Sequence, residues 1–237
     1  MADDDNLPAR SSSRDIRAFV DKSKQVPART GPGPRGRLIF ALDATASRQP
    51  TWDRACGIQG DMFRAADNLG GLAVQLCFYR GMGEFSASPW YTVSDDVVQR
   101  MTSVFCLGGL TQIGKVLRHT LKEAKKSKIN ALVFIGDCVE EDPDQLAHLA
   151  GQIGILGVPV FLFHEGNDPN TIRVFRQIAQ LTRGAACPFD HASAGQLRDL
   201  LSAVAVYASG GRRALEKFSE GRHASVKQLT RQLDPDR

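Results

Sequence analysis

Leu38-Ile-Phe-Ala-Leu42, followed directly by Asp43-Ala-Thr-Ala-Ser47, is the stretch that decides the fold of this 237-residue chain. A short continuous apolar run is typical of a strand that is covered on both faces of its sheet. Side chains with oxygen ligands begin directly after the run, at Asp43. Ligands of an open parallel sheet bind at the carboxyl ends of its strands, so this boundary is the first candidate for a functional site.

Further apolar runs alternate with segments whose apolar residues recur at helical spacing. The runs span 72–79, 131–135, 158–163 and 184–187, and the helical segments span 51–69, 111–126, 143–156, 170–181 and 195–207. This alternation predicts right-handed crossovers and a doubly wound, mostly parallel α/β sheet with helices on both faces, a Rossmann-like arrangement. Residues 84–91 follow the second run after a Gly81-Met-Gly83 connection, which is too short for a crossover and predicts one antiparallel edge strand.

Composition divides the chain into three parts. Residues 1–36 are rich in Ser, Pro, Gly and charge, which predicts a flexible arm. Residues 37–208 form the expected α/β domain. Residues 209–237 form a basic tail, whose apolar residues have the spacing of an amphipathic helix interrupted at Gly221. Five apolar side chains would line one face of that helix: Leu215, Phe218, Val226, Leu229 and Leu233.

The net charge of +4 comes from the two ends of the chain. Basic and acidic residues number 8 and 5 in residues 1–37, 15 and 17 in residues 38–210, and 7 and 4 in residues 211–237. A near-neutral body argues against nucleic-acid binding by the folded domain, because such surfaces concentrate Lys and Arg. Binding of nucleic acid or of an acidic surface is left to the tails.

Two features predict a cytoplasmic protein. No apolar run approaches the roughly 18 residues of a membrane-spanning helix, and the start, Met-Ala-Asp-Asp-Asp, lacks the basic and apolar regions of a secretory signal. Cys56, Cys77, Cys106, Cys138 and Cys187 are an odd and scattered set. They predict reduced thiols rather than a disulfide framework or a zinc knuckle.

Oxygen ligands gather where the expected strands end. Asp43, Thr45 and Ser47 follow the first strand, and Asp137 follows the run 131–135. Thr111, in Gly108-Gly-Leu-Thr111, lies at the expected N-cap of the helix over 111–126. Two carboxylates and three hydroxyls at one edge of a sheet suit a hard cation such as Mg²⁺ or Mn²⁺. With Asp43 at a strand end, we expect Asp43→Ala to abolish metal binding and to leave the fold intact.

These motif pieces resemble the metal-ion-dependent adhesion site (MIDAS) of von Willebrand factor type A domains. The resemblance spans residues 37–208 and includes the order of the elements. It implies a protein-interaction domain, not an enzyme, whose bound metal captures an Asp or Glu of a partner protein. It further implies that Thr45 and Ser47 bind the metal directly, that Thr111 binds directly or through water, and that Asp43 and Asp137 act largely through water. Thr45 departs from the usual Ser but keeps the hydroxyl.

Two other functional interpretations remain open. Gly109-Leu-Thr-Gln-Ile-Gly-Lys115 matches a nucleotide-binding loop, although Val116 stands where that motif holds magnesium with Ser or Thr. Phosphoryl transfer through Asp43 is chemically possible, but its second Asp is replaced by Thr45. The acidic run Glu140-Glu-Asp142-Pro-Asp144 is interpreted as solvated groups that favour a helix dipole rather than as part of a metal rim.

Overall fold

The computed structural model describes residues 35–49, 72–189, 194–219 and 224–233. These described residues all belong to one compact unit. The expected helix over 51–69 and Cys56 lie outside the described residues, as does the arm apart from Arg35 and Gly36. No described helix is long and apolar enough to cross a membrane.

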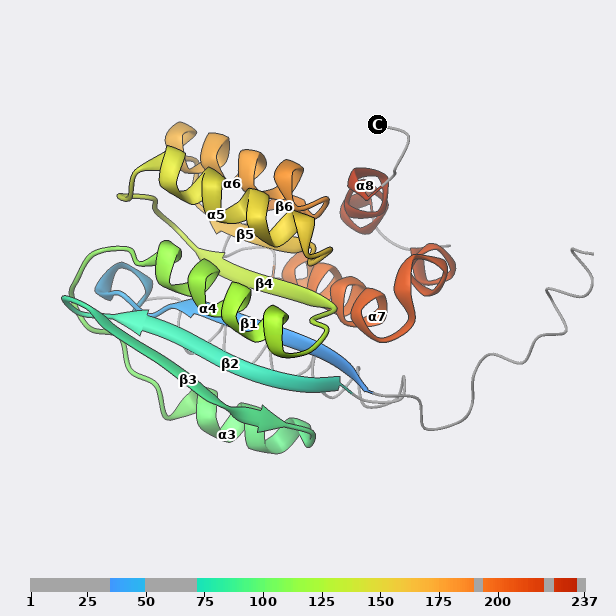
Figure 1. Ribbon diagram of the computed structural model, residues 1–237, viewed down its shortest axis with the longest axis horizontal. Helices are drawn as coiled ribbons and strands as arrows, with labels where there is room; N and C mark the ends of the chain where they lie inside the picture. Colours follow the sequence, from blue (N-terminus) through green and yellow to red (C-terminus); the bar gives the residue numbers. More distant parts are fainter. Residues whose placement is uncertain (1–34, 50–71, 190–193, 220–223, 234–237) are drawn as a thin grey trace, which may run out of the picture. The chain divides into compact units, whose positions relative to one another are not determined.

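Six strands form one sheet in the order β3-β2-β1-β4-β5-β6 (Figure 1). All neighbours pair in parallel except β2 and β3, so the predicted antiparallel edge strand is confirmed. A chain that winds outward from β1 in both directions leaves the carboxyl ends of β1 and β4 side by side. The strands are β1 (Gly36–Asp43), β2 (Leu72–Arg80), β3 (Glu84–Tyr91), β4 (Ala131–Gly136), β5 (Val160–Glu165) and β6 (Ala185–Phe189).

Alternation along β1 divides the core into two layers, because successive side chains of a strand point to opposite faces. Ile39 and Ala41 pack in the cluster that also holds the buried residues of α4 (Ile113–Lys126), α5 (Pro143–Ile155) and α6 (Pro169–Leu181). Leu38 and Phe40 pack in the cluster of α3 (Ser94–Thr102), α7 (Ala194–Ser219) and α8 (Ala224–Gln232). Helices therefore cover both faces, as the doubly wound prediction requires (Figure 1).

Local sequence explains where several helices begin. Pro143 and Pro169 lie in the first turns of α5 and α6, as expected from their fixed φ. Asp142 and Asp168 cap these helices by accepting from backbone N–H groups. Helix α4 begins at Ile113 with Gln112 at the N-cap, so the expected N-cap position of Thr111 is wrong by one residue. Helix α3 was not predicted, because its buried apolar residues are confined to Val97 and Met101.

The segment predicted as a basic tail packs on the sheet. Helix α7 continues past residue 208 and changes direction at Gly211, whose φ is 71°. Leu215, Val226 and Leu229 are buried in the core layer of α7, with Phe218 and Leu233 packed against it. Gln232 also bonds the backbone of Ala186 on β6, at 3.1 and 3.4 Å. The apolar face predicted for this segment is therefore covered by the domain itself.

Candidate metal centre

Asp43 is the fixed point of the candidate site. It is the last residue of β1, as expected, but its side chain is 0% exposed, so this strand end is buried rather than open to solvent. Its Oδ1 accepts from Thr45 N at 2.8 Å, and its Oδ2 accepts from the Tyr79 hydroxyl at 2.8 Å. Tyr79 pairs with Asp43 in the β1–β2 register, and both side chains therefore leave the sheet on the same face.

Burial sets the electrostatics of this pair. It raises the pKa of Asp43, while the hydrogen bonds from Thr45 and Tyr79 oppose that rise and the charge of Asp137 adds to it. Burial and the neighbouring Asp43 raise the pKa of Tyr79 well above its usual value, so the phenol stays protonated and serves as a donor. The carboxylate of Asp43 is thus held by two donors inside the protein.

Thr45 and Ser47 bring two hydroxyl oxygens together. Their Oγ1 and Oγ atoms are 3.1 Å apart, across the start of the short 3-10 helix Ala46–Arg48. Neighbouring ligands of an octahedral magnesium ion, each about 2.1 Å from the metal, lie about 3.0 Å apart. The spacing of the two hydroxyls therefore fits two adjacent positions of such a shell.

Asp137 follows β4, next to Asp43. Leu42 pairs with Ile135 in the β1–β4 register, and a Cβ added at Gly136 would lie 3.5 Å from Asp43 Cβ. Among the described residues, Asp137 Oδ1 is buried and has no hydrogen-bond partner. A buried carboxylate oxygen in that state is costly unless a cation or water satisfies it. This oxygen fits the expected role of Asp137 at a metal.

Thr111 is tied to the same edge through Glu140. Thr111 N donates to Glu140 Oε2 at 2.8 Å, and Glu140 N donates to Thr111 Oγ1 at 3.0 Å. The hydroxyl oxygen keeps a second lone pair for another ligand. Leu107 N donates to Ala44 O at 3.0 Å, which joins the loop before Thr111 to the motif that begins at Asp43. The five predicted residues thus lie in segments that meet at one edge of the sheet.

The acidic run has a second role, which its sequence does not indicate. Asp142 caps α5, as the dipole interpretation implies, but Glu140 and Glu141 reach across to the start of α4. Glu141 accepts from Gly114 N at 2.9 Å and also from Ile113 N. No local sequence pattern predicts these bonds, because the acceptors lie 27–29 residues from their donors.

A buried cation lies beside the site, and it too was missed. Arg48, which is 1% exposed, forms an ion pair with Glu165 at the end of β5. Burial lowers the pKa of Arg48, and the charges of Asp137 and Asp43 are the largest effects that oppose this. The guanidinium is thus close enough to both carboxylates to influence the charge of the site.

The geometry of Gly109–Lys115 does not favour a nucleotide-binding loop. Such a loop offers free backbone N–H groups to phosphates. Here the N–H groups of Thr111, Ile113 and Gly114 are taken by the two glutamates. Lys115 Nζ donates to Gly83 O at 2.6 Å and to Gln112 Oε1 at 2.7 Å.

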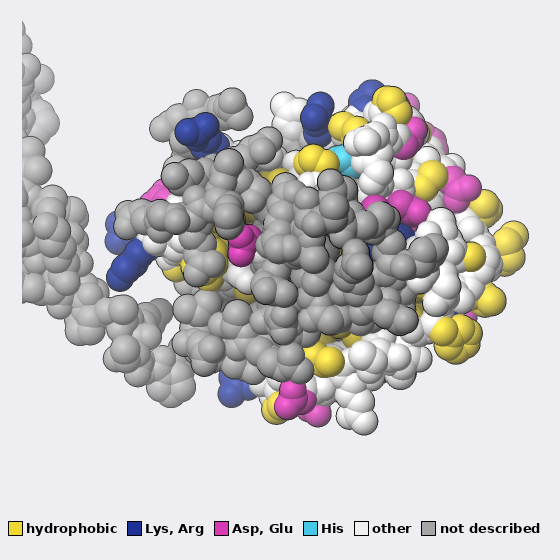
Figure 2. Space-filling view, turned by 180° about the vertical axis from the view of Figure 1, so that it is seen from behind, with side chains coloured by type: hydrophobic (Ala, Val, Ile, Leu, Met, Phe, Trp, Pro, Cys, Tyr) yellow, Lys and Arg dark blue, Asp and Glu magenta, His cyan; other side chains and the backbone are white. Residues whose placement is uncertain are grey.

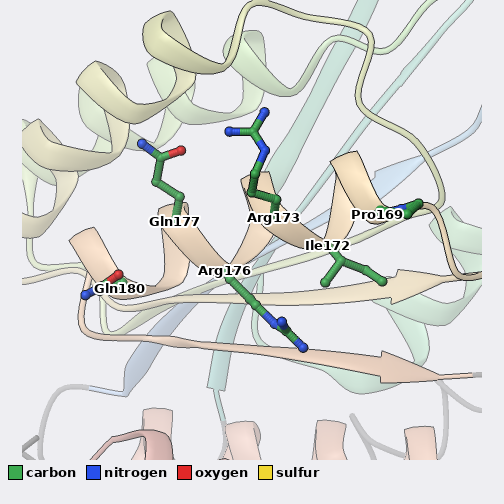
Figure 3. A pocket seen from close by; sticks show the side chains of 6 residues that line it. All are labelled: Pro169, Ile172, Arg173, Arg176, Gln177 and Gln180. Carbon is green, nitrogen blue, oxygen red and sulfur yellow. The ribbon is translucent and has the colours of Figure 1, made fainter.

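A separate hollow of about 610 Å³ lies on α6, and the described residues that line it all belong to that helix (Figure 3). Its side chains fan out rather than converge, with Arg173 and Arg176 on different sides of the helix (Figure 3). None of the five predicted metal ligands lines it. Among the described residues, no cluster of three or more His, Cys, Asp or Glu forms a metal site, so any cation here depends on hydroxyls as well as carboxylates.

The order of the strands, the antiparallel β3 and the helices on both faces define the fold of von Willebrand factor type A domains. No protein-family model matches the sequence, and no curated protein matches it. Solved structures do match. The von Willebrand factor type A protein from Catenulispora acidiphila is 14% identical, with a TM-score of 0.55, over 71% of this chain and 42% of that chain.

Two further structures extend the comparison. The SpRpn10 VWA domain is 13% identical, with a TM-score of 0.57, and the match covers 80% of this chain and 100% of that domain. The manganese-loaded TRAP protein of Plasmodium vivax is 13% identical, with a TM-score of 0.53, over 71% of this chain and 73% of that chain. Structural matches at identities this low establish the fold alone, so function has to be argued from the site.

Proposed function

We propose that this chain is a protein-interaction domain in which a divalent cation, Mg²⁺ or Mn²⁺, captures an Asp or Glu of a partner protein. Thr45, Ser47 and Thr111 would hold the cation through their hydroxyls, with Asp43 and Asp137 as the carboxylates. The bound cation would supply an open coordination position for the partner's acid. The manganese-loaded relative in fold supports a divalent ion of this class.

One observation carries the proposal. Asp137 Oδ1 is buried without a hydrogen-bond partner among the described residues, at the edge where two hydroxyls lie 3.1 Å apart. Neutral hydroxyls leave a metal with more positive charge than a shell of carboxylates does. A metal held in this way attracts one further carboxylate, and a partner protein supplies it.

Calorimetric titration of Mg²⁺ and of Mn²⁺ tests the proposal, with acetate present to fill the open position. Asp43→Asn is the informative variant, because the amide keeps an acceptor for Thr45 N and a polar contact for Tyr79 while the charge is lost. We expect binding by the unmodified chain, loss of binding in Asp43→Asn and in Asp137→Ala, and no change in Asp144→Asn, an exposed carboxylate of α5.

The fold of each variant is checked by urea denaturation. Because burial raises the pKa of Asp43, removal of its charge should not lower the free energy of unfolding of the metal-free protein at pH 7. Absence of binding to the unmodified chain, or binding that survives in both site variants, would overturn the proposal.

A further inference from the structure

Apolar side chains are exposed at the same edge as the candidate metal site. Four large hydrophobic residues define a surface that we call the apolar rim: Met82, Phe105, Leu107 and Leu110, which are 86%, 61%, 47% and 54% exposed. They lie in the β2–β3 turn and in the loop between α3 and α4. Figure 2 shows hydrophobic side chains gathered at the right-hand end of that view. Grouped exposure of this kind marks interaction surfaces more often than single exposed residues do.

The two loops of the apolar rim pack on each other. Gly81 N donates to Leu107 O at 3.3 Å, and Gln112 Nε2 donates to Gly81 O at 3.2 Å. A Cβ added at Gly109 would lie 2.0 Å from Gly81 O, so only glycine allows this approach of the two backbones. The four side chains therefore come from two loops that are held against each other by these contacts.

The apolar rim is directly continuous with the metal motif. Leu107 N bonds Ala44 O, and Ala44 lies between Asp43 and Thr45. Two cations border the rim, and one of them, Arg80, is paired with Glu84 at 2.9 Å. The Arg80 guanidinium stacks over the Phe105 ring at 4.1 Å and donates to Phe105 O at 3.0 Å. Lys115 Nζ is fixed on the β2–β3 turn at Gly83 O. An apolar surface that borders the proposed metal site would be complementary to a segment that carries both an acidic and an apolar side chain.

We propose that the partner segment that supplies the acidic ligand carries a large apolar side chain within about two residues of that acid, which packs on the apolar rim. The inference rests on the proposed function, because the metal fixes where the acid lies. It adds the chemical class of the partner: an exposed protein segment in which Asp or Glu is flanked by Leu, Ile, Met or Phe. The metal contact supplies attraction for any carboxylate, and the apolar contact supplies the choice among carboxylates.

Short peptides test the inference on the full chain. The probes are acetyl-Ser-Leu-Asp-Leu-Ser-amide, its analogue with Ser in place of both Leu, and its analogue with Asn in place of Asp. Binding is measured by NMR chemical-shift titration with Mg²⁺ or with chelator. We expect the Leu-Asp-Leu peptide to bind about tenfold more tightly than the Ser-Asp-Ser peptide when Mg²⁺ is present.

The preference should disappear in the double variant Met82→Ser/Leu110→Ser. Both side chains are more than half exposed, so these changes leave the core intact. The matched control is Ile155→Ser/Leu156→Ser, at the end of α5, where the two side chains are 86% and 43% exposed. This control should keep the tenfold preference.

Each outcome separates the two proposals. Equal, Mg²⁺-dependent affinity for the two Asp peptides overturns the apolar inference and leaves the metal proposal standing. A chain that binds neither Mg²⁺ nor any peptide overturns both. A preference for Leu that persists with chelator or with the Asn peptide overturns the link between rim and metal. Mg²⁺-dependent self-association that Met82→Ser/Leu110→Ser abolishes would assign the rim to a second copy of the chain and overturn the inference as stated.

Discussion

Tyr79 donates its hydroxyl proton to Asp43 Oδ2 at 2.8 Å, and neither side chain is exposed to solvent. The bond joins neighbouring parallel strands at the point where the candidate metal site begins. It keeps a buried carboxylate in place without neutralising it, because a phenol is a donor that carries no charge. The position of Asp43 in the candidate site therefore follows from the packing of the sheet.

Tyr79→Phe should lower the free energy of unfolding by about 1.5–3 kcal/mol, the range for a hydrogen bond to a charged group. It should also weaken Mg²⁺ binding, because the lost bond opposes the rise in the pKa of Asp43. Urea denaturation and calorimetry measure the two effects. Tyr91→Phe is the control, since Tyr91 pairs with Val74 at the other end of β2. Unchanged metal affinity in Tyr79→Phe would show that Asp43 does not depend on this donor.

Glu140→Ala should weaken Mg²⁺ binding several-fold with a loss of stability of only about 1 kcal/mol. The reason is positional: Glu140 accepts from Thr111 N and donates to Thr111 Oγ1, and the side-chain half of this exchange would be lost. Glu140→Gln keeps an acceptor oxygen and should retain most of the affinity.

Glu141→Ala serves as the comparison for that prediction. It removes the acceptor of Ile113 N and Gly114 N at the start of α4. Its effect should fall on the free energy of unfolding, by about 1–2 kcal/mol, rather than on metal affinity. If both glutamate variants changed metal affinity equally, the specific role of Glu140 would be wrong.

Arg48→Met and Glu165→Gln should each lower the free energy of unfolding by about 3–5 kcal/mol, because each removes one member of a buried ion pair. The double variant Arg48→Met/Glu165→Gln should lose much less free energy of unfolding than the sum of the losses in the two single variants. Denaturation of all four proteins gives the coupling energy directly. Additive losses would mean that the two side chains do not interact appreciably in solution.

The free energy of unfolding should fall as the pH drops below about 6.5, the usual pKa of histidine. Burial, followed by the charges of Lys126 and Lys122, lowers the pKa of His119 in the folded protein, against the opposing charge of Glu123. The unfolded chain therefore binds the proton more readily, and stability is lost as the pH falls through the lowered folded value.

His119→Gln isolates this contribution. The amide retains a donor toward Gln75 Oε1, which His119 Nε2 contacts at 2.8 Å. Measured by urea denaturation, the free energy of unfolding of the variant minus that of the unmodified chain should be more positive at pH 5.5 than at pH 7.5. If this difference in the free energy of unfolding were the same at both pH values, His119 would not be a source of the pH dependence. His164, whose pKa burial also lowers, is present in both proteins and cancels.

Strand and helix order could be predicted from sequence because both depend on local periodicity. Apolar runs such as Leu38–Leu42 require burial on two faces, and Gly81-Met-Gly83 leaves room only for a hairpin. Helix α3 could not be predicted, because two buried apolar residues, Val97 and Met101, are too few to give a clear helical periodicity. The packing of Leu215 and Val226 into the core could not be predicted, because an amphipathic helix has the same sequence pattern whether its own domain or a partner covers the apolar face.

The sequence by itself determined the sheet, its antiparallel edge and the positions of the candidate oxygen ligands, because strand ends follow from where apolar runs stop. Only the tertiary structure decided what surrounds those ligands. It placed the Tyr79 hydroxyl on Asp43, Glu140 on Thr111 and the Arg48–Glu165 ion pair beside both carboxylates. It also joined two distant loops into the apolar rim through the contact of Gly81 with Leu107. These contacts join residues 26 to 117 positions apart, and no local pattern encodes a pairing that arises only when the strands align in register.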